Sequence, residues 1–296
     1  MADLGRVTGT SAARLVSALV GDIAALLAAG GVPEARREAQ DIIAAVLDVP
    51  RFWPLAHAGQ SVDDATHAAA LRAAALRARG APFAYAVGRA AFRHLVLDVD
   101  ERVLIPRQET EQLVEEVLAM AAGRGGVAID VGTGSGAIAL SLATEGRFGR
   151  VIATDVSLDA LVVARRNLAA IAPSVRAPVE LRHGSLLAPV RRERASVIVS
   201  NPPYIAHEEL AALPASVRDW EPGIALSCGA GGMSVIARLV RGAADLLEPR
   251  GIFALEVDAR RSSLAAELLA CDARYDNISV RLDLAGRERF VFAERR

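Results

Sequence analysis

Apolar runs with the length of buried β-strands alternate with helical segments over the second half of the chain. The first run, Val127–Val131, is followed by a glycine-rich turn and by a helix that starts at Ala137. Later runs end at Asp155 and at Ser200. Strands that alternate with helices usually pair in parallel, through right-handed crossovers. The pattern therefore predicts an α/β fold with a mostly parallel sheet.

The N-terminal part of the chain has helical periodicity from about Ala12 to Gly80. Interruptions of this pattern at Gly30, before Pro50 and near Ser61 divide it into three helices. The third helix carries Asp63 and Asp64 in its first turn. The segment Phe92–Val99 then indicates a hairpin or an extended connector. We therefore predict a helical domain over residues 1–80, a β-hairpin or linker over 81–106, and the α/β domain over 107–296.

Composition excludes several classes of protein. With 296 residues, of which 52% are hydrophobic, the chain can bury a sizeable core. The formal net charge of −1 provides no global field for nucleic acid, and no apolar run reaches membrane-spanning length. The two cysteines, Cys228 and Cys271, and the five histidines lack metal-ligand spacing. We expect a cytoplasmic, monomeric protein with buried free thiols, no metal, and no membrane or stable nucleic-acid partner.

The buried run Ala195–Ser200 is directly followed by the tetrapeptide Asn201-Pro202-Pro203-Tyr204. Proline fixes its own φ and pushes the preceding residue towards extended geometry. The side-chain oxygen of Asn201 and the carbonyl of Pro202 then form two acceptors at the carboxyl end of a strand, where open α/β sheets bind ligands. They match the two hydrogens of a planar NH2 group, and Tyr204 offers a flat face for it. A proline-rich turn that only ends a strand is the alternative.

A second motif joins the first strand to its helix. This motif is the turn Gly132-Thr133-Gly134-Ser135-Gly136. Its glycines let the backbone pass close to a ligand at a helix N-terminus. Asp155, at the end of the next strand, can accept hydrogen bonds from both hydroxyls of a ribose. The turn also fits a dinucleotide fingerprint with Ala137 in the last position, so a nicotinamide or flavin enzyme competes here. A P-loop is excluded because no Gly-Lys-Ser/Thr follows.

The two motifs and Asp155 taken together distinguish between these classes of enzyme. The glycine turn, the acid and the tetrapeptide all follow strands, so they meet at one edge of the predicted sheet. A nucleoside cofactor would then lie beside a site for an NH2 group. S-adenosyl-L-methionine fits, because it has a ribose, an adenine and a sulfonium methyl group open to in-line attack. A hydride acceptor needs no paired acceptors for an amine, so a methyltransferase is favoured.

Over nearly its whole length the chain resembles the HemK/PrmC family of protein-(glutamine-N5) methyltransferases. The resemblance is carried by Pro82–Tyr85 with Gly88, Phe92, Leu104–Arg107 with Glu109-Thr110, Asp130–Gly136, Ser200–Ile205, Glu221-Pro222, and Asp283–Gly286 with Arg289. The tetrapeptide alone is shared with adenine-N6 methyltransferases, whereas Ile-Pro-Arg-x-Glu-Thr is more specific. The resemblance implies a Rossmann-like class I methyltransferase domain, with a mostly parallel seven-stranded sheet, and a small N-terminal helical bundle that recognises the protein substrate.

The resemblance also implies residue roles. The turn from Gly132 to Gly136 would cradle the methionine end of the cofactor, Asp155 would hold its ribose, and Ser185 and Leu186 would flank its adenine. The target would be the glutamine of a Gly-Gly-Gln loop in peptide chain release factors, whose modification tunes translation termination. Its amide would be bound by the lip Asn201, Pro202, Pro203 and Tyr204, and near the cofactor and the mouth of the site would lie Arg107, Glu109 and Thr110.

Two positions depart from the family pattern. Gln108 replaces a usual Pro, and Ser185 replaces an Asp that commonly contacts the adenine amine. Losing a charge-assisted hydrogen bond costs about 1.5–3 kcal/mol, so we expect weaker cofactor binding. Neither departure touches the methyl-accepting lip.

We expect direct, in-line methyl transfer without a covalent enzyme intermediate and without a strong base, because an N-methylated amide cation loses its proton readily. Three rivals remain open: a glutamine methyltransferase of a large-subunit ribosomal protein, an adenine-N6 nucleic-acid methyltransferase, and a nucleotide-binding scaffold that has lost its chemistry.

Overall fold

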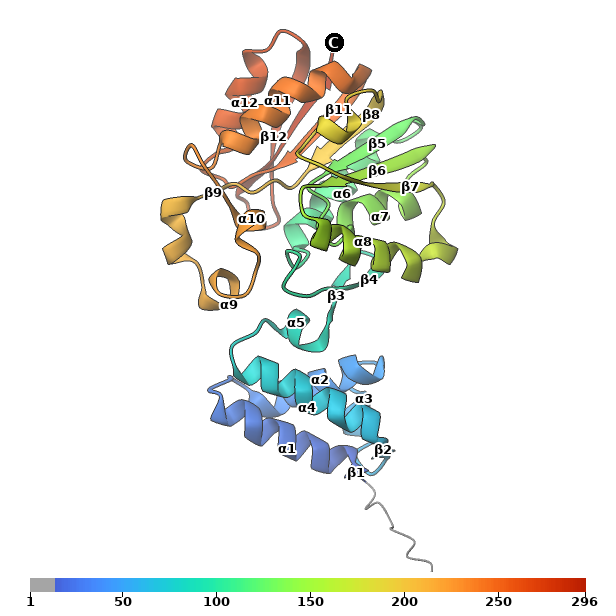
Figure 1. The fold of residues 1–296 in the computed structure, drawn as a ribbon, viewed down its shortest axis with the longest axis vertical. Helices are drawn as coiled ribbons and strands as arrows, with labels where there is room; N and C mark the ends of the chain where they lie inside the picture. The colour runs from blue at the N-terminus through green and yellow to red at the C-terminus, as the bar shows by residue number, and fades with distance from the viewer. Residues whose placement is uncertain (1–13) are drawn as a thin grey trace, which may run out of the picture. The chain divides into compact units, whose positions relative to one another are not determined.

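The computed structural model describes residues 14–296, and the chain divides into two compact units, Met1–Val87 and Gly88–Arg296. Figure 1 shows the first unit as a group of helices and the second as a sheet with helices on both faces. Of the helices within residues 14–296, none combines the length and the hydropathy needed to cross a bilayer.

The first unit is a helical bundle around a single apolar core. Its core residues other than Val32 come from the three longer helices, which are α1 (Val16–Ala29), α2 (Ala35–Leu47) and α4 (Asp64–Ala78). These correspond to the three predicted helices, although the predicted start near Ala12 lies outside the described residues. Asp63 is the N-cap of α4 rather than part of its first turn, and its carboxylate accepts a hydrogen bond from the Thr66 N–H at 2.7 Å. Four short elements have no periodic pattern in the sequence, namely α3 (Trp53–Ala56), α5 (Phe83–Val87), β1 (Arg14–Leu15) and β2 (Ser61–Val62).

The second unit is built on a seven-stranded sheet with the order β12-β13-β11-β8-β5-β6-β7. Its strands are β5 (Val127–Val131), β6 (Arg150–Asp155), β7 (Val179–His183), β8 (Ala195–Ser200), β11 (Leu247–Glu256), β12 (Tyr275–Leu282) and β13 (Glu288–Arg295). Neighbouring strands are parallel from β7 to β11, and β13 is antiparallel to both of its neighbours. The predicted fold class is therefore confirmed. The strand order reverses at β5, between β6 and β8, which creates the crevice where such sheets bind ligands.

Helices cover both faces of this sheet (Figure 1). One face packs against α6 (Gln108–Met120), α7 (Ala137–Glu145) and α8 (Leu158–Ala170), and the other against α11 (Ser234–Leu246) and α12 (Ser262–Ala270). Successive strand residues alternate between the two cores: Ala128 belongs to the first and Ile129 to the second. A strand buried on both faces reads as a continuous apolar run, which is why the sequence revealed these strands so clearly.

Three features of the second unit differ from expectation. The predicted hairpin is present, but its strands are β3 (Arg89–Phe92) and β4 (Leu95–Asp98), so it begins before Phe92. Cys271 is exposed directly after α12, which corrects the expectation of two buried thiols; Cys228 is buried. Short elements without a periodic pattern also occur, namely η1 (Ala172–Ser174), η2 (Ala188–Val190), β9 (Ile205–Ala206), η3 (His207–Ala212), α9 (Ala215–Arg218), α10 (Gly223–Leu226) and β10 (Ser227–Cys228).

Candidate functional site

A cavity of about 240 Å³ lies at the carboxyl edge of the sheet, beside the point where the strand order reverses. The strands β5, β6 and β8 bring the two sequence motifs together there. Of the predicted site residues, those that line the cavity are Gly132, Gly134, Asp155, Ser185, Leu186, Asn201 and Pro203. Those outside its lining are Arg107, Glu109, Thr110, Thr133, Ser135, Gly136, Pro202 and Tyr204.

The glycine turn leaves room for a ligand. Gly132, Gly134 and Gly136 have φ values of 76°, 56° and 88°, in the left-handed region that side chains disfavour. A Cβ added to Gly132 or Gly134 would meet open space, whereas one at Gly136 would lie 3.1 Å from Leu140 Cδ1. The first two glycines therefore border the cavity, and the third is required for packing at the start of α7.

Asp155 connects the turn to the next strand. Its Oδ2 accepts a hydrogen bond from the Gly134 N–H at 2.9 Å, and its Oδ1 accepts one from the Ser157 N–H at 2.9 Å. Each carboxylate oxygen has a second lone pair, so the group can also accept from a ligand. The cavity thus offers a carboxylate acceptor for a diol, backbone that a ligand can approach closely, and an apolar wall that includes Val156, Leu186 and Ile224. This donor and acceptor set fits the ribose and adenine of S-adenosylmethionine.

Asp130 lies behind the glycine turn, at the end of β5, and is fully buried. Its Oδ2 accepts hydrogen bonds from the Thr133 hydroxyl at 2.6 Å and from the Ala139 N–H at 3.1 Å, while Oδ1 has no partner within residues 14–296. Burial raises the pKa of Asp130 to about 7, against the opposing effect of these hydrogen bonds.

This shift makes the stability of the protein depend on pH. Because the folded state keeps the Asp130 proton up to about pH 7 and the unfolded state releases it near 3.8, this group destabilises the fold increasingly as pH rises through that window. We expect Asp130→Asn to gain stability relative to wild type between pH 5 and pH 8, measured by urea unfolding at each pH. Asp276→Asn, at an exposed site on β12, is the control and should show no such trend. A constant difference between wild type and Asp130→Asn would contradict the assignment.

The tetrapeptide is held from both sides. The Nδ2 of Asn201 donates to Thr110 Oγ1 at 3.0 Å, and its Oδ1 has no hydrogen-bond partner among the described residues. The carbonyl of Pro203 accepts a hydrogen bond from the Cys228 thiol at 3.1 Å. Tyr204 packs against the second core and does not line the cavity; burial raises its pKa. A residue of the cavity lining therefore keeps a carboxamide oxygen without a partner among the described residues.

The segment around α6 contributes through ion pairs. Arg107 is the N-cap residue of α6 and pairs at 2.5 Å with Glu221, which is buried and also accepts from the Ile105 N–H at 3.3 Å. Glu109 pairs with Arg287 at 3.3 Å. The first pair ties the start of α6 to the segment that carries Pro222, a residue of the cavity wall.

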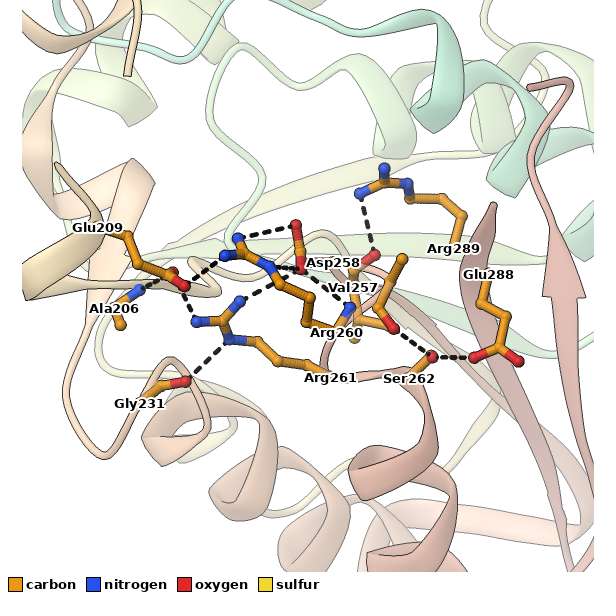
Figure 2. A network of polar contacts seen from close by, with 11 residues as sticks. Ala206, Glu209, Gly231, Val257, Asp258, Arg260, Arg261, Ser262, Glu288 and Arg289 are labelled. Atoms are coloured by element: carbon orange, nitrogen blue, oxygen red, sulfur yellow. Dashed lines mark hydrogen bonds and ion pairs between the residues drawn. The ribbon is translucent and has the colours of Figure 1, made fainter. Parts of the chain in front are cut away.

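Residues 205–233 form a wall of the cavity that the sequence analysis did not assign. The cavity residues from this segment are Pro222, Ile224, Ala225, Ser227 and Cys228. Of these cavity residues, only Pro222 carried a sequence signal for the site, through the family resemblance. Figure 2 shows how the segment is held: Glu209 lies between two guanidinium groups, with Arg260 Nη1 at 2.6 Å and Arg261 Nη2 at 2.6 Å. Arg261 is buried and also donates to the carbonyl of Gly231 at 2.9 Å, which anchors both ends of the segment to the chain after β11.

The far end of the cavity is polar and basic. Ser185 is exposed and accepts a hydrogen bond from Arg238 Nη2 at 3.4 Å. Arg238, on α11, lines the cavity, and no feature of the helical sequence pattern distinguishes it from the other arginines. Within residues 14–296, no group of three or more His, Cys, Asp or Glu side chains is arranged to hold a metal ion.

A larger hollow of about 720 Å³ lies in the first unit. Its arginines are already occupied by carboxylates, in the pairs Arg37–Glu34, Arg51–Asp41 and Arg77–Glu38. Because these arginines and carboxylates are paired with one another, the described residues of the hollow offer no unpaired arginine to a ligand. We therefore assign the functional site to the cavity in the second unit.

Comparisons with known proteins identify the family to which the chain is similar. The family models described as PrmC N-terminal domain and Methyltransferase small domain match residues 18–88 and 97–217. A protein named Release factor glutamine methyltransferase, from Moorella thermoacetica, is 40% identical over 94% of this chain and 97% of its own length. Its namesake from Cereibacter sphaeroides is 39% identical over 90% and 94%. The solved hMettl16 catalytic domain in complex with the MAT2A 3'UTR hairpin 6 shares 16% identity at a TM-score of 0.53, covering 80% of this chain and 84% of that one, which is a likeness of fold.

Proposed function

Because the chain belongs to the release factor glutamine methyltransferase family, we propose that it transfers a methyl group from S-adenosylmethionine to a glutamine side-chain amide of peptide chain release factors. The fold and the family make it an S-adenosylmethionine-dependent methyltransferase. We assign the target to the glutamine of a Gly-Gly-Gln motif. The observation that carries the proposal is the free Oδ1 of Asn201 at the edge of a cavity with a glycine turn and an acid.

The cofactor supplies an electrophilic methyl group on a sulfonium sulfur. Asp155 accepts from the ribose hydroxyls, Gly132 and Gly134 admit the methionine end, and Ser185 and Leu186 border the adenine. In this assignment the outer residues Arg107 and Glu109 support the mouth of the site through their ion pairs.

Asn201 Oδ1 and the carbonyl of Pro202 accept the two hydrogens of the substrate amide, which aims the nitrogen lone pair at the methyl carbon, while Tyr204 supports the plane of the amide. A nitrogen–carbon bond forms as the carbon–sulfur bond breaks, and S-adenosylhomocysteine leaves. The two acceptors stabilise the positive charge that grows on nitrogen. The methylated amide then loses one proton to water, so the site needs no strong base.

The proposed function also assigns roles to the domains and a partner to the protein. The helical domain over residues 1–80 recognises the protein substrate, and the domain over 107–296 carries out the methyl transfer. We propose that the protein acts as a monomer in the cytoplasm, on release factors rather than on nucleic acid.

A methylation assay with a radiolabelled methyl donor tests the function. We expect label on purified release factor, and none on a release factor whose Gly-Gly-Gln glutamine is replaced by alanine. A large-subunit ribosomal protein and an adenine-containing oligonucleotide serve as competing substrates. Label on either of these alone would assign the protein to one of the rival activities, and cofactor binding without labelling of any substrate would favour a scaffold.

A further inference from the structure

Three polar side chains from distant parts of the chain form a line behind the methyl-accepting lip. Asn201, after β8, donates from Nδ2 to Thr110 Oγ1 at 3.0 Å, and Thr110, on α6, donates from Oγ1 to Glu256 Oε2 at 2.7 Å. Glu256 is the last residue of β11. Thr110 and Glu256 are 5% and 1% exposed, and neither lines the cavity.

The hydrogen bonds in this line run in one direction. A threonine hydroxyl has a single hydrogen, and here it is donated to the Glu256 carboxylate, which when ionised can only accept. The hydroxyl can therefore only accept from Asn201, and the NH2 group is the only donor on that carboxamide. The amide is thus held with Nδ2 turned inward and Oδ1 turned away from Thr110. The opposite orientation would present an NH2 group to a substrate NH2 group, so that two donors would face each other.

We infer that Thr110 and Glu256 are positioning residues for methyl transfer, which fix the Asn201 carboxamide with its oxygen towards the substrate nitrogen. This inference rests on the proposed function for the role of Oδ1, but the orientation itself is a property of the free protein. Neither residue lines the cavity, so we assign them a role that acts through Asn201.

The protonation state of Glu256 controls which way the hydrogen bonds between Glu256, Thr110 and Asn201 are donated. Burial raises the pKa of Glu256 to about 7, and Glu109 also raises it, while the Thr110 hydroxyl, Arg289 and Arg107 lower it. Tyr204 also interacts electrostatically with Glu256, and it stays neutral because burial raises its own pKa. A protonated Glu256 can donate to Thr110, which frees the hydroxyl hydrogen to turn towards Oδ1 and favours the flipped amide. The rate at saturating substrates should therefore fall as pH decreases through about 7.

Three variants test the inference. Thr110→Val keeps the shape and removes the hydroxyl; we expect kcat to fall about 10- to 100-fold, with S-adenosylmethionine affinity changed by less than about threefold. Thr110→Ser restores the hydroxyl and should return kcat to within about threefold of wild type. Glu256→Gln cannot ionise, so the decrease of kcat below about pH 7 should disappear in this variant. A role in packing alone would leave the pH profile in place.

A readout without catalysis separates this inference from the proposed function. In the free protein, the side-chain amide protons of Asn201 should exchange with water slowly in wild type and faster in Thr110→Val, measured by NMR on 15N-labelled protein. If wild type does not methylate release factors but shows this exchange pattern, the function is wrong and the orientation stands. Wild-type kcat in Thr110→Val, or an unchanged pH profile in Glu256→Gln, would overturn the inference. If Thr110→Val does not fold, the Glu256→Gln profile decides.

Discussion

Replacing Asn201 by alanine is expected to lower kcat for methyl transfer by at least about 100- to 1000-fold, the usual cost of removing one preorganised dipole from a transition-state site. Asn201 supplies the carboxamide acceptor of the lip, and the Pro202 carbonyl alone cannot hold both hydrogens of a substrate amide. The rate is measured in single turnovers with release factor and a labelled methyl donor, so that product release does not hide the chemical step.

Cofactor binding serves as the control for this variant. Asn201 is one of many residues that line the cavity, so calorimetry should show that S-adenosylmethionine still binds, with reduced affinity. Such a result would assign the loss to chemistry rather than to folding. Full activity in Asn201→Ala would contradict the assignment of the lip as the methyl-acceptor site.

The second large effect is expected at Asp155. Its carboxylate holds the Gly134 and Ser157 N–H groups and faces the cavity, so Asp155→Ala removes acceptors for a ribose and loosens the glycine turn at once. Charge-assisted hydrogen bonds contribute about 1.5–3 kcal/mol each, so the loss of two predicts about a 100-fold or greater decrease in S-adenosylmethionine affinity.

Asp159→Ala is the matched control for Asp155→Ala. Asp159 is an exposed acid in the first turn of α8, and it does not line the cavity, so its removal changes the net charge equally without touching the site. Calorimetric titration of the three proteins compares the affinities directly. Equal affinities for wild type and Asp155→Ala would exclude Asp155 from the cofactor site.

Tertiary ion pairs, rather than local helix or strand propensity, hold the cavity wall formed by residues 205–233. The segment has no long helix or strand, yet it contributes several residues to the cavity. Its position depends on the ion pairs of Glu209 with Arg260 and the buried Arg261, and on the pair between the partly exposed Arg107 and the buried Glu221. Breaking a buried ion pair leaves an uncompensated charge, which is strongly destabilising, so such pairs can hold a segment that propensity alone would not.

The sequence by itself determined the parts whose signals are local. The buried strands β5 and β8 were continuous apolar runs, the turn after β5 needed glycine for its positive φ values, and the two prolines after Asn201 marked the end of a strand. Because carboxyl ends of parallel strands share one edge, these local signals sufficed to place both motifs at a common cleft.

Tertiary structure alone decided which side chains meet behind that cleft. Thr110 lies 91 positions from Asn201 and 146 positions from Glu256, and no periodicity relates them. Cys271 and Cys228 are chemically identical in the sequence, and only the packing of the surrounding elements exposes one and buries the other. Local patterns report backbone preferences and the polarity of a face, whereas hydrogen bonds between distant side chains exist only once the strand order and helix packing have brought them together.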